Sequence, residues 1–209
     1  MYTLFLIGNI ASGKSTAARY LESLGARRID LDAMAKELYV PGSQLVTDLI
    51  DAFGWEILDA DGGVCFSALA RVAFASPEHT AQLNAIVHPV LLDRLTAMLL
   101  PVNCCSTIVP DIALTVVEVS AATSFTDAFG LADEVMAITA PVDIRRMRAV
   151  ERGMDAEDFD RRADVQPSEE QLCGLATMVI DNTVADDCLF HTLDAWIADC
   201  HIRLGDSRA

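Results

Sequence analysis

Near its N-terminus the chain reads Thr3-Leu-Phe-Leu-Ile-Gly-Asn-Ile-Ala-Ser-Gly-Lys-Ser-Thr16. The apolar run Leu4–Ile7 has the composition of a buried strand, and Gly8–Ser15 matches G-x-x-x-x-G-K-[ST] at every fixed position. Downstream, apolar residues recur with helical spacing at Ala17, Ala18, Leu21 and Leu24. A strand, a glycine-rich turn and a helix in this order predict a phosphate-binding loop, or P-loop.

The chemistry of a P-loop explains these residue types. Gly8 and Gly13 let the backbone curl so that its amides face a phosphate, which the positive end of the following helix also favours. Lys14 would bind the β- and γ-phosphates, and the Ser15 hydroxyl would ligate Mg²⁺. The alternative is a glycine-rich turn with an incidental lysine, but the flanking strand and helix favour a nucleoside triphosphate. The expected nucleotide-binding residues are Gly8, Asn9, Ile10, Ala11, Ser12, Gly13, Lys14, Ser15 and Thr16.

Short apolar runs alternate with longer amphipathic stretches, which predicts an α/β fold with a mainly parallel sheet of five strands and helices on both faces. The expected strands are Thr3–Ile7, Arg27–Asp30, Thr107–Val109, Val135–Thr139 and Met178–Asp181. The expected helices are Lys14–Leu24, Ala33–Tyr39, Gln44–Phe53, Phe66–Ala75, Glu78–Leu100, Val142–Arg152, Ala156–Ala163 and Asp187–Arg203.

The 209 residues fit a single domain of the three-layer P-loop kinase type. We expect a core of residues 1–39, 101–142 and 173–209. Residues 40–100 lack a strand pair for the sheet, so they form a helical insertion that binds substrate. The polar, arginine-rich residues 143–172 form a helical lid. A compact kinase would use two such appendages to hold an acceptor and close over the phosphates.

The charge is distributed unevenly along the chain. The formal net charge is −16, which argues against a nucleic-acid-binding role. Residues 1–36 nevertheless carry +2 and residues 145–162 carry +1, while the remaining residues carry −19. Cations that persist in two segments of so acidic a chain suggest a locally bound anion.

The six cysteines show no Cys-x-x-Cys spacing, so small buried thiols in a reducing compartment are favoured over a zinc site or disulfides. The apolar run before Gly8 is too short for a membrane span. We therefore expect a cytoplasmic protein that binds no membrane.

An acceptor hydroxyl needs a base or an orienting carboxylate. Asp30 and Asp32 end the second expected strand, at the sheet edge where the P-loop also opens. We expect Asp32 to orient the attacking hydroxyl or accept its proton. The alternative is that Asp32 caps the helix Ala33–Tyr39, and the two roles can coexist.

A series of further motifs runs through the chain in a recognisable order. They are Ile29–Asp32, Pro41-Gly42, Phe53-Gly54, Arg71 with Phe74, Leu83–Pro89, Asp111-Ile112 with Glu118, Arg148 with Arg152, Gln166, and Val179–Asn182. Together with Gly8–Thr16, this series resembles the dephospho-CoA kinase family over nearly the whole chain.

The resemblance implies transfer of the ATP γ-phosphoryl group to the ribose 3′-hydroxyl of dephospho-CoA. It implies ATP and Mg²⁺ as cofactors and Asp32, Lys14, Arg148 and Arg152 as the catalytic residues, with Asn182 near the adenine. Asp32, Arg71 and His88 would contact the substrate, His88 as a packed or capping residue beside Pro89 rather than a proton carrier. We expect a monomer or weak homo-oligomer. The alternative for the lid arginines is a solvated face balanced by Glu151, Asp155, Glu157, Asp158 and Asp160.

The chain also departs from the family pattern. Asn9 replaces a glycine, Ala113 replaces a proline that would follow Asp111-Ile112, and Pro110 should end the third strand. A lid arginine of the family falls at Leu172, with Gln171 beside it. Two alternatives follow: a P-loop kinase for another nucleoside or small metabolite, and a nucleotide-binding relative impaired in turnover.

Overall fold

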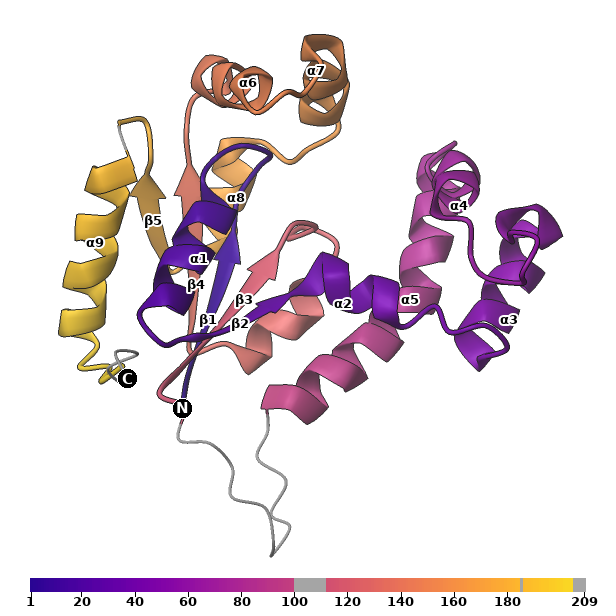
Figure 1. The fold of residues 1–209 in the computed structure, drawn as a ribbon, viewed down its shortest axis with the longest axis horizontal. Helices are drawn as coiled ribbons and strands as arrows, with labels where there is room; N and C mark the ends of the chain where they lie inside the picture. The colour runs from indigo at the N-terminus through magenta and orange to yellow at the C-terminus, as the bar shows by residue number, and fades with distance from the viewer. Residues whose placement is uncertain (100–111, 185, 205–209) are drawn as a thin grey trace, which may run out of the picture. The chain divides into compact units, whose positions relative to one another are not determined.

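The computed structural model describes residues 1–99, 112–184 and 186–204, and Figure 1 shows its fold. The strands are β1 Tyr2–Ile7, β2 Arg27–Asp30, β3 Leu114–Val119, β4 Glu134–Thr139 and β5 Met178–Asp181. The α-helices are α1 Lys14–Ser23, α2 Leu31–Glu37, α3 Gln44–Phe53, α4 Phe66–Ala73, α5 Pro77–Leu99, α6 Val142–Glu151, α7 Ala156–Asp164, α8 Glu169–Leu175 and α9 Asp186–Asp199. Two 3-10 helices are η1 Trp55–Ile57 and η2 Thr126–Leu131.

The strands form one 5-stranded sheet with the order β2-β3-β1-β4-β5. Every pairing is parallel, so the carboxyl ends of all strands lie along the same edge. The predicted α/β class is confirmed, and β1, β2, β4 and β5 begin and end within one residue of their predicted bounds. Each predicted helix is also present: Gln44–Phe53 has its predicted ends, and the others differ at one or both ends by one to four residues.

The third strand differs from its prediction. Thr107–Val109 lies outside the described residues, and the strand between β1 and β2 is Leu114–Val119. All of its residues are buried, as expected for a β-branched run covered on both faces. Glu118, which was expected after the strand, is therefore part of it, opposite Asp30 of β2. That placement was wrong because a short run before Pro110 was taken for the strand, whereas the longer run after it fills the sheet.

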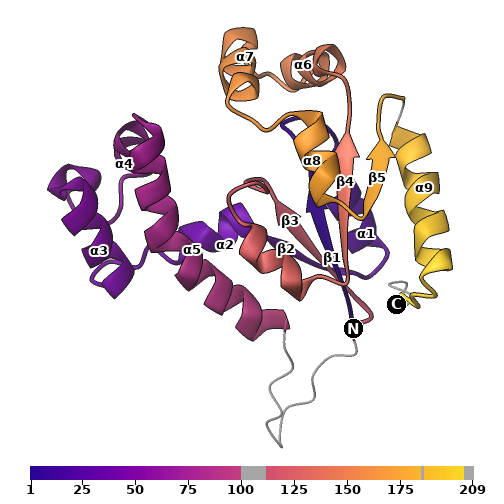
Figure 2. The same ribbon diagram turned by 180° about the vertical axis from the view of Figure 1, so that it is seen from behind.

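Helices cover both faces of the sheet and complete three layers (Figures 1 and 2). Leu4 and Leu6 of β1 pack against α1 and α9 in one hydrophobic cluster. Side chains alternate along a strand, so Phe5 points to the opposite face. There its ring meets Phe129 of η2 edge to face, with ring centroids 5.9 Å apart.

The segment 143–172 is helical, as predicted, but it contains a helix that the sequence analysis missed. Helix α8 begins with a capping box in which the Ser168 hydroxyl accepts from the Gln171 amide and the Gln171 side chain accepts from the Ser168 amide. The pattern Ser-x-x-Gln is a sequence signature of a helix start. It could have predicted α8 despite the polar composition of this region.

The described residues divide into two compact units: residues 1–31 with 112–184 and 186–204, and residues 32–99. The first unit contains the sheet. The second has its own hydrophobic core, built from α3, η1, α4 and α5 around Leu49, Phe53 and Ile57. Its residues 40–99 contribute helices and one isolated bridge, Leu58 with Val64, and no strand of the sheet.

Candidate functional site

The P-loop connects β1 to α1 in the first unit. Gly13 precedes α1 with φ 109°, a left-handed conformation that favours glycine, and no side chain caps the helix there. The amides of the first helical turn have no partner within the helix, and the helix dipole makes this end positive. A helix start of this kind favours an anion, which is the local property that the predicted phosphate site requires.

Asn182 supports the loop from behind. It lies just after β5, is 2% exposed, and donates through Nδ2 to the Ser12 carbonyl over 2.8 Å. A Cβ added at Gly13 would lie 2.2 Å from that nitrogen. The structure thus brings the predicted residue Asn182 to the P-loop, where it fixes the backbone and excludes any side chain larger than hydrogen at Gly13.

The start of the loop is held by residues of the helical segment 143–172. The Ile10 amide donates to Gln166 Oε1 over 2.9 Å, and the Ile10 carbonyl accepts from Arg145 Nη1 over 3.3 Å. Asn9 Nδ2 donates to the Pro167 carbonyl over 2.9 Å. The backbone N–H and the backbone carbonyl of Ile10 therefore both form hydrogen bonds, and these bonds fix this part of the loop.

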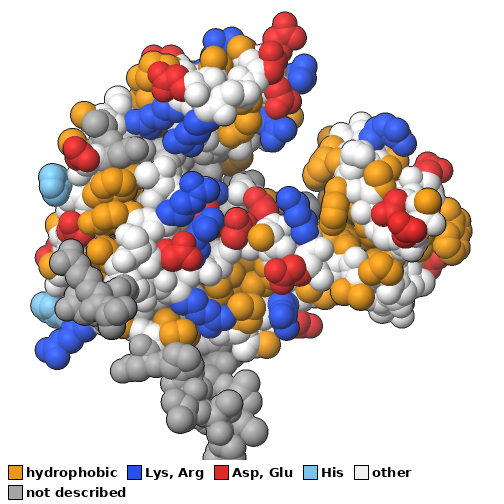
Figure 3. Space-filling view, in the orientation of Figure 1, with side chains coloured by type: hydrophobic (Ala, Val, Ile, Leu, Met, Phe, Trp, Pro, Cys, Tyr) orange, Lys and Arg blue, Asp and Glu red, His pale blue; other side chains and the backbone are white. Residues whose placement is uncertain are grey.

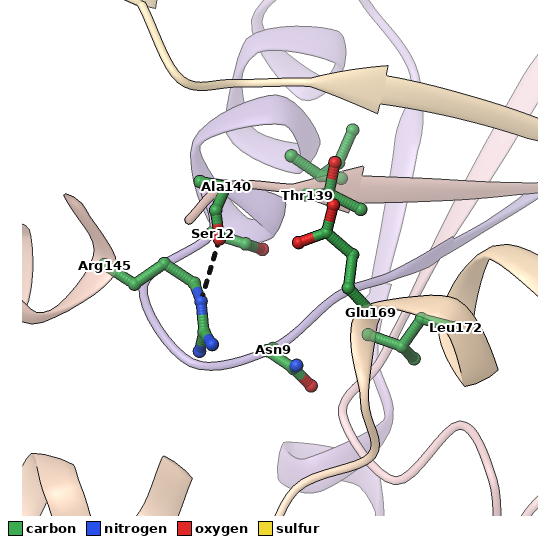
Figure 4. Close-up of a pocket in the computed structure, with 8 residues that line it drawn as sticks. Asn9, Ser12, Thr139, Ala140, Arg145, Glu169 and Leu172 are labelled. Atoms are coloured by element: carbon green, nitrogen blue, oxygen red, sulfur yellow. Dashed lines mark hydrogen bonds between the residues drawn. The ribbon is translucent and has the colours of Figure 1, made fainter. Parts of the chain in front are cut away.

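Arg145 is the buried member of the arginine-rich segment, 9% exposed (Figure 4). Its Nε donates to the Ala140 carbonyl over 3.0 Å, and its guanidinium lies 5.9 Å from the centroid of the Phe159 ring. Burial lowers the pKa of Arg145, and the Glu169 carboxylate acts in the opposite direction. The sequence had assigned Arg145 no role, and the structure makes it a link between α6, β4 and the P-loop.

A cavity of about 10 Å³ lies between the loop and α8, lined by Ser12, Arg145, Glu169 and Leu172 among others (Figure 4). No described residue provides a hydrogen-bond partner for the buried Ser12 hydroxyl. The space is large enough for about one water molecule and far too small for a nucleotide. Leu172, where the family resemblance expected an arginine, is 2% exposed and packs here as an apolar residue.

A charged cluster surrounds the other end of the loop. Glu118 of β3 is 4% exposed, and its Oε2 accepts from the Ser15 hydroxyl over 2.8 Å. Lys14 Nζ lies 3.9 Å from the same oxygen and donates to Ser120 Oγ over 3.0 Å. The arrangement places a carboxylate and a hydroxyl beside the P-loop lysine. The sequence analysis missed the position of Glu118, although an acid near the end of the apolar run Leu114–Val119 was a usable signal.

Arg28 of β2 completes this cluster. Its Nε donates to Glu118 Oε1 over 2.5 Å. Burial lowers the pKa of Arg28, but the hydrogen bond and the charge of Glu118, with Glu22 and Asp30, outweigh burial and raise it. Arg28 is therefore a second cation, beside Lys14, in the cluster around Glu118.

The two predicted lid arginines lie in different surroundings. Arg148 Nη1 and Nη2 donate to the carbonyls of Asn182 over 2.8 Å and Val184 over 2.9 Å. Arg152 is exposed at the end of α6 and lines an open pocket of about 490 Å³ together with Ile10 and Ala11 of the P-loop. Ala11 has φ 60°, unusual for a residue with a Cβ. Of the two predicted arginines, Arg152 is therefore the one that lines a pocket together with residues of the P-loop.

The other lid arginines form surface ion pairs. Arg146 pairs with Asp160 over 2.9 Å, and Arg161 and Arg162 pair with Asp158 over 3.3 and 3.0 Å. Figure 3 shows basic and acidic side chains interspersed over α6 and α7. For these three arginines, the structure therefore agrees with the alternative interpretation, a solvent-exposed face on which acidic residues balance the arginines.

The remaining predicted site residues belong to the second unit. Asp32 is exposed in the first turn of α2, which begins at Leu31, so the alternative in which Asp32 is the N-cap of a helix from Ala33 was wrong. Arg71 is exposed in the last turn of α4, and His88 is half-buried in α5 next to Pro89. Their roles stay predictions.

A P-loop between the first strand and helix of a five-stranded parallel sheet, with helices on both faces, defines a P-loop kinase fold. A shikimate kinase from Acinetobacter baumannii shares the fold at a TM-score of 0.54 and 14% identity, over 97% of this chain and 96% of its own. The sequence model of the dephospho-CoA kinase family matches residues 2–187. The chain therefore belongs to the dephospho-CoA kinase family, as its motifs predicted, and is a kinase.

Individual relatives agree with this assignment. A dephospho-CoA kinase from Corynebacterium diphtheriae is 35% identical, over 90% of this chain and 92% of its own. One from Thermobifida fusca is 33% identical, over 95% and 94%. The crystal structure of TT1252 from Thermus thermophilus matches with a TM-score of 0.74 and 29% identity, over 95% and 97%.

None of the helices within residues 1–99, 112–184 and 186–204 has the length and hydropathy of a membrane span. Within the same ranges, no group of three or more His, Cys, Asp or Glu side chains is arranged to hold a metal ion.

Proposed function

We propose that this kinase transfers the γ-phosphoryl group of ATP to the ribose 3′-hydroxyl of dephospho-CoA, giving CoA and ADP. Membership of the family supports this substrate. The single observation that supports the chemistry is the P-loop at the N-terminus of α1, with Lys14 and Ser15 held beside Glu118.

Lys14 and the amides of the loop would bind the phosphates of ATP. The Lys14 ammonium is held by a hydroxyl at 3.0 Å and a carboxylate at 3.9 Å. A triphosphate carries more negative charge than this single carboxylate, so it can compete for the ammonium. Apart from Ile10 and Ser12, whose amides already donate to Gln166 and Asn9, the loop amides need no such exchange. The loop is already shaped by the hydrogen bonds of Asn182 to Ser12 and of Arg145 to Ile10.

Mg²⁺ fits the side chains present. The Ser15 hydroxyl and the Glu118 carboxylate lie 2.8 Å apart, and neutral or anionic oxygens are the ligands that Mg²⁺ prefers. Ser15 would hold the ion, and Glu118 would orient the Ser15 hydroxyl. A bound Mg²⁺ would neutralise charge on the β- and γ-phosphates.

Asp32 would act on the acceptor hydroxyl by orienting it or accepting its proton. Its support is its exposed carboxylate and its place in the chain, two residues after Asp30 at the carboxyl end of β2. Arg71 and His88 would contact the dephospho-CoA, as the family motifs imply.

Arg152 and Arg148 would stabilise the transferred group. Arg152 is supported by the pocket that it lines with Ile10 and Ala11. Arg148 would have to leave the carbonyls of Asn182 and Val184, so we assign it the smaller contribution. The free thiols Cys65, Cys173, Cys188 and Cys200 support a reducing, cytoplasmic setting.

The reaction is tested by following ADP release with dephospho-CoA as the acceptor. A panel of nucleosides and small hydroxylated metabolites tests the substrate class, and a reaction without acceptor gives the background. We expect dephospho-CoA to raise ADP release far above background and the panel to leave it unchanged. Release at background level across a range of Mg²⁺ concentrations would overturn the proposal.

The role of Asp32 is tested by Asp32→Asn. We expect turnover to fall by roughly 10²-fold, the usual contribution of a positioned base, with ATP affinity within a few-fold of wild type. Asp51→Asn, which neutralises an exposed carboxylate on α3 of the same unit, is the matched control and should retain full turnover. Equal turnover of the two variants would remove Asp32 from the mechanism.

A further inference from the structure

Arg28 lies in the second strand, away from the P-loop in sequence, yet its closest polar contact is with the buried acid of the loop cluster. Its Nε is 2.5 Å from Glu118 Oε1, and its other nitrogens lie 3.8 Å from Glu22 and 3.6 Å from Asp30. The Arg28 side chain is 21% exposed and that of Glu118 is 4% exposed. The contact to Glu118 is therefore the shortest and the most buried of the three.

The two oxygens of Glu118 are divided between two partners. Oε1 accepts from Arg28, whereas Oε2 accepts from Ser15 and lies 3.9 Å from Lys14. Among the described residues, Arg28 and Lys14 are the two cations that pair with Glu118. A carboxylate this deeply buried needs a paired cation, because burial disfavours its charge. Without Arg28, Lys14 would be the remaining partner.

We propose that Arg28 is a positioning residue for the P-loop: by neutralising Glu118 at Oε1, it keeps Oε2 on Ser15 and keeps Lys14 available to the phosphates. The inference rests on the proposed function, because it presumes that Lys14 and Ser15 bind the nucleotide and its Mg²⁺. Arg28 lies outside the loop, on strand β2, and its charge determines whether Lys14 pairs with Glu118 or with the phosphates.

The proposal is tested by the binding of a fluorescent ADP analogue, with and without Mg²⁺, to Arg28→Met and its matched control Arg27→Met. The control removes the adjacent cation on the same strand. We expect Arg28→Met to weaken nucleotide binding roughly 10-fold to 100-fold, the usual range for a residue that orients a ligand of a metal site. Arg27→Met should bind as wild type, and Arg28→Lys should recover part of the loss.

A double variant separates positioning from a general loss of stability. In Arg28→Met/Glu118→Gln the uncompensated charge is gone, so Lys14 is released and binding should recover relative to Arg28→Met. A purely structural role for Arg28 predicts that binding falls and recovers together with the Tm of each variant, whereas the positioning role predicts weaker binding by Arg28→Met at temperatures where that variant is fully folded. Thermal unfolding of each variant is measured in parallel.

A second comparison tests the same role if Arg28→Met does not fold. In that case the double variant is compared with Glu118→Gln alone, and we expect equal affinity because Arg28 has no charge left to neutralise. A clear difference between these two, or equal binding by folded Arg28→Met and Arg27→Met, would overturn it. These measurements need no acceptor, so failure of wild type to use dephospho-CoA would reject the proposed function alone.

Discussion

The two ends of the P-loop are held by different kinds of interaction. At the start, Ile10 is fixed through its backbone amide and carbonyl by Gln166 and Arg145 of the helical segment 143–172. At the end, Lys14 and Ser15 are fixed through their side chains by Glu118, which in turn pairs with Arg28. Backbone contacts determine the shape of the loop, whereas the ionic cluster determines where its charges point.

Because of this difference, substitutions at the two ends of the loop should affect nucleotide binding in different ways. Changes at the backbone-held end should alter nucleotide affinity without altering its dependence on Mg²⁺. Changes in the ionic cluster should alter both, because Ser15 is the candidate ligand of Mg²⁺ and Glu118 orients its hydroxyl. Substitutions at the backbone-held end and in the loop itself therefore test whether the two ends of the loop are held independently.

The largest effect is expected for Gly13→Ala, which distorts both ends at once. Its Cβ would lie 2.2 Å from Asn182 Nδ2, at a φ of 109° that alanine rarely adopts. We expect nucleotide affinity to fall by about 10²-fold, as for a displacement of about 1 Å in a positioned site. Binding of an ADP analogue measures the loss.

Gly174→Ala is the control for that substitution. Nothing lies within 4 Å of a Cβ at Gly174, which is in helix α8, so nucleotide binding should be unchanged. Alanine in a helix interior is favoured over glycine by roughly 0.5–1 kcal/mol, so its Tm should rise slightly. A similar loss of binding in both variants would contradict the steric argument.

An intermediate effect is expected for Arg145→Met, with Arg146→Met as the neighbouring control. Arg145 is 9% exposed and donates to two backbone carbonyls, and hydrogen bonds from charged donors stabilise by about 1.5–3 kcal/mol each. We expect a Tm lower by several degrees and weaker nucleotide binding. Arg146 pairs on the surface with Asp160, so its loss should leave both measurements unchanged. Equal Tm values for the two variants would show that the carbonyl contacts contribute little.

The smallest effect is expected for Gln166→Ala, which removes one neutral hydrogen bond to the Ile10 amide. A bond of this kind contributes about 1 kcal/mol, which corresponds to roughly 5-fold in nucleotide affinity. The Mg²⁺ dependence of binding should not change, unlike that of Arg28→Met. A shifted Mg²⁺ dependence would mean that the two ends of the loop are not independent.

The sequence predicted the fold where the local signals were complete. The strand, glycine-rich turn and helix of residues 2–23 and the strands β2, β4 and β5 followed from short apolar runs with clear breaks. The third strand was misplaced because two β-branched runs flank Pro110, and periodicity alone cannot tell which one is buried on both faces. Helix α8 was missed because its capping box lies in a polar segment.

The candidate site was predicted unevenly for the same reason. Lys14, Ser15 and the loop glycines were identified, since one continuous motif contains them. Glu118 was expected outside the sheet and Arg28 was given no role, because their contact depends on β2 and β3 being neighbours. The adjacent arginines Arg145 and Arg146 look alike in sequence, and burial alone gave them different functions.

By itself, the sequence determined the P-loop, the α/β class and membership of the kinase family, because each of these is encoded in short contiguous stretches. Only the tertiary structure decided what holds the loop. Arg28 and Glu118 are 90 residues apart, and Asn182 and Ser12 are 170 residues apart. Such pairs meet through the strand order of the sheet, which long-range packing sets and which local patterns of residues do not specify.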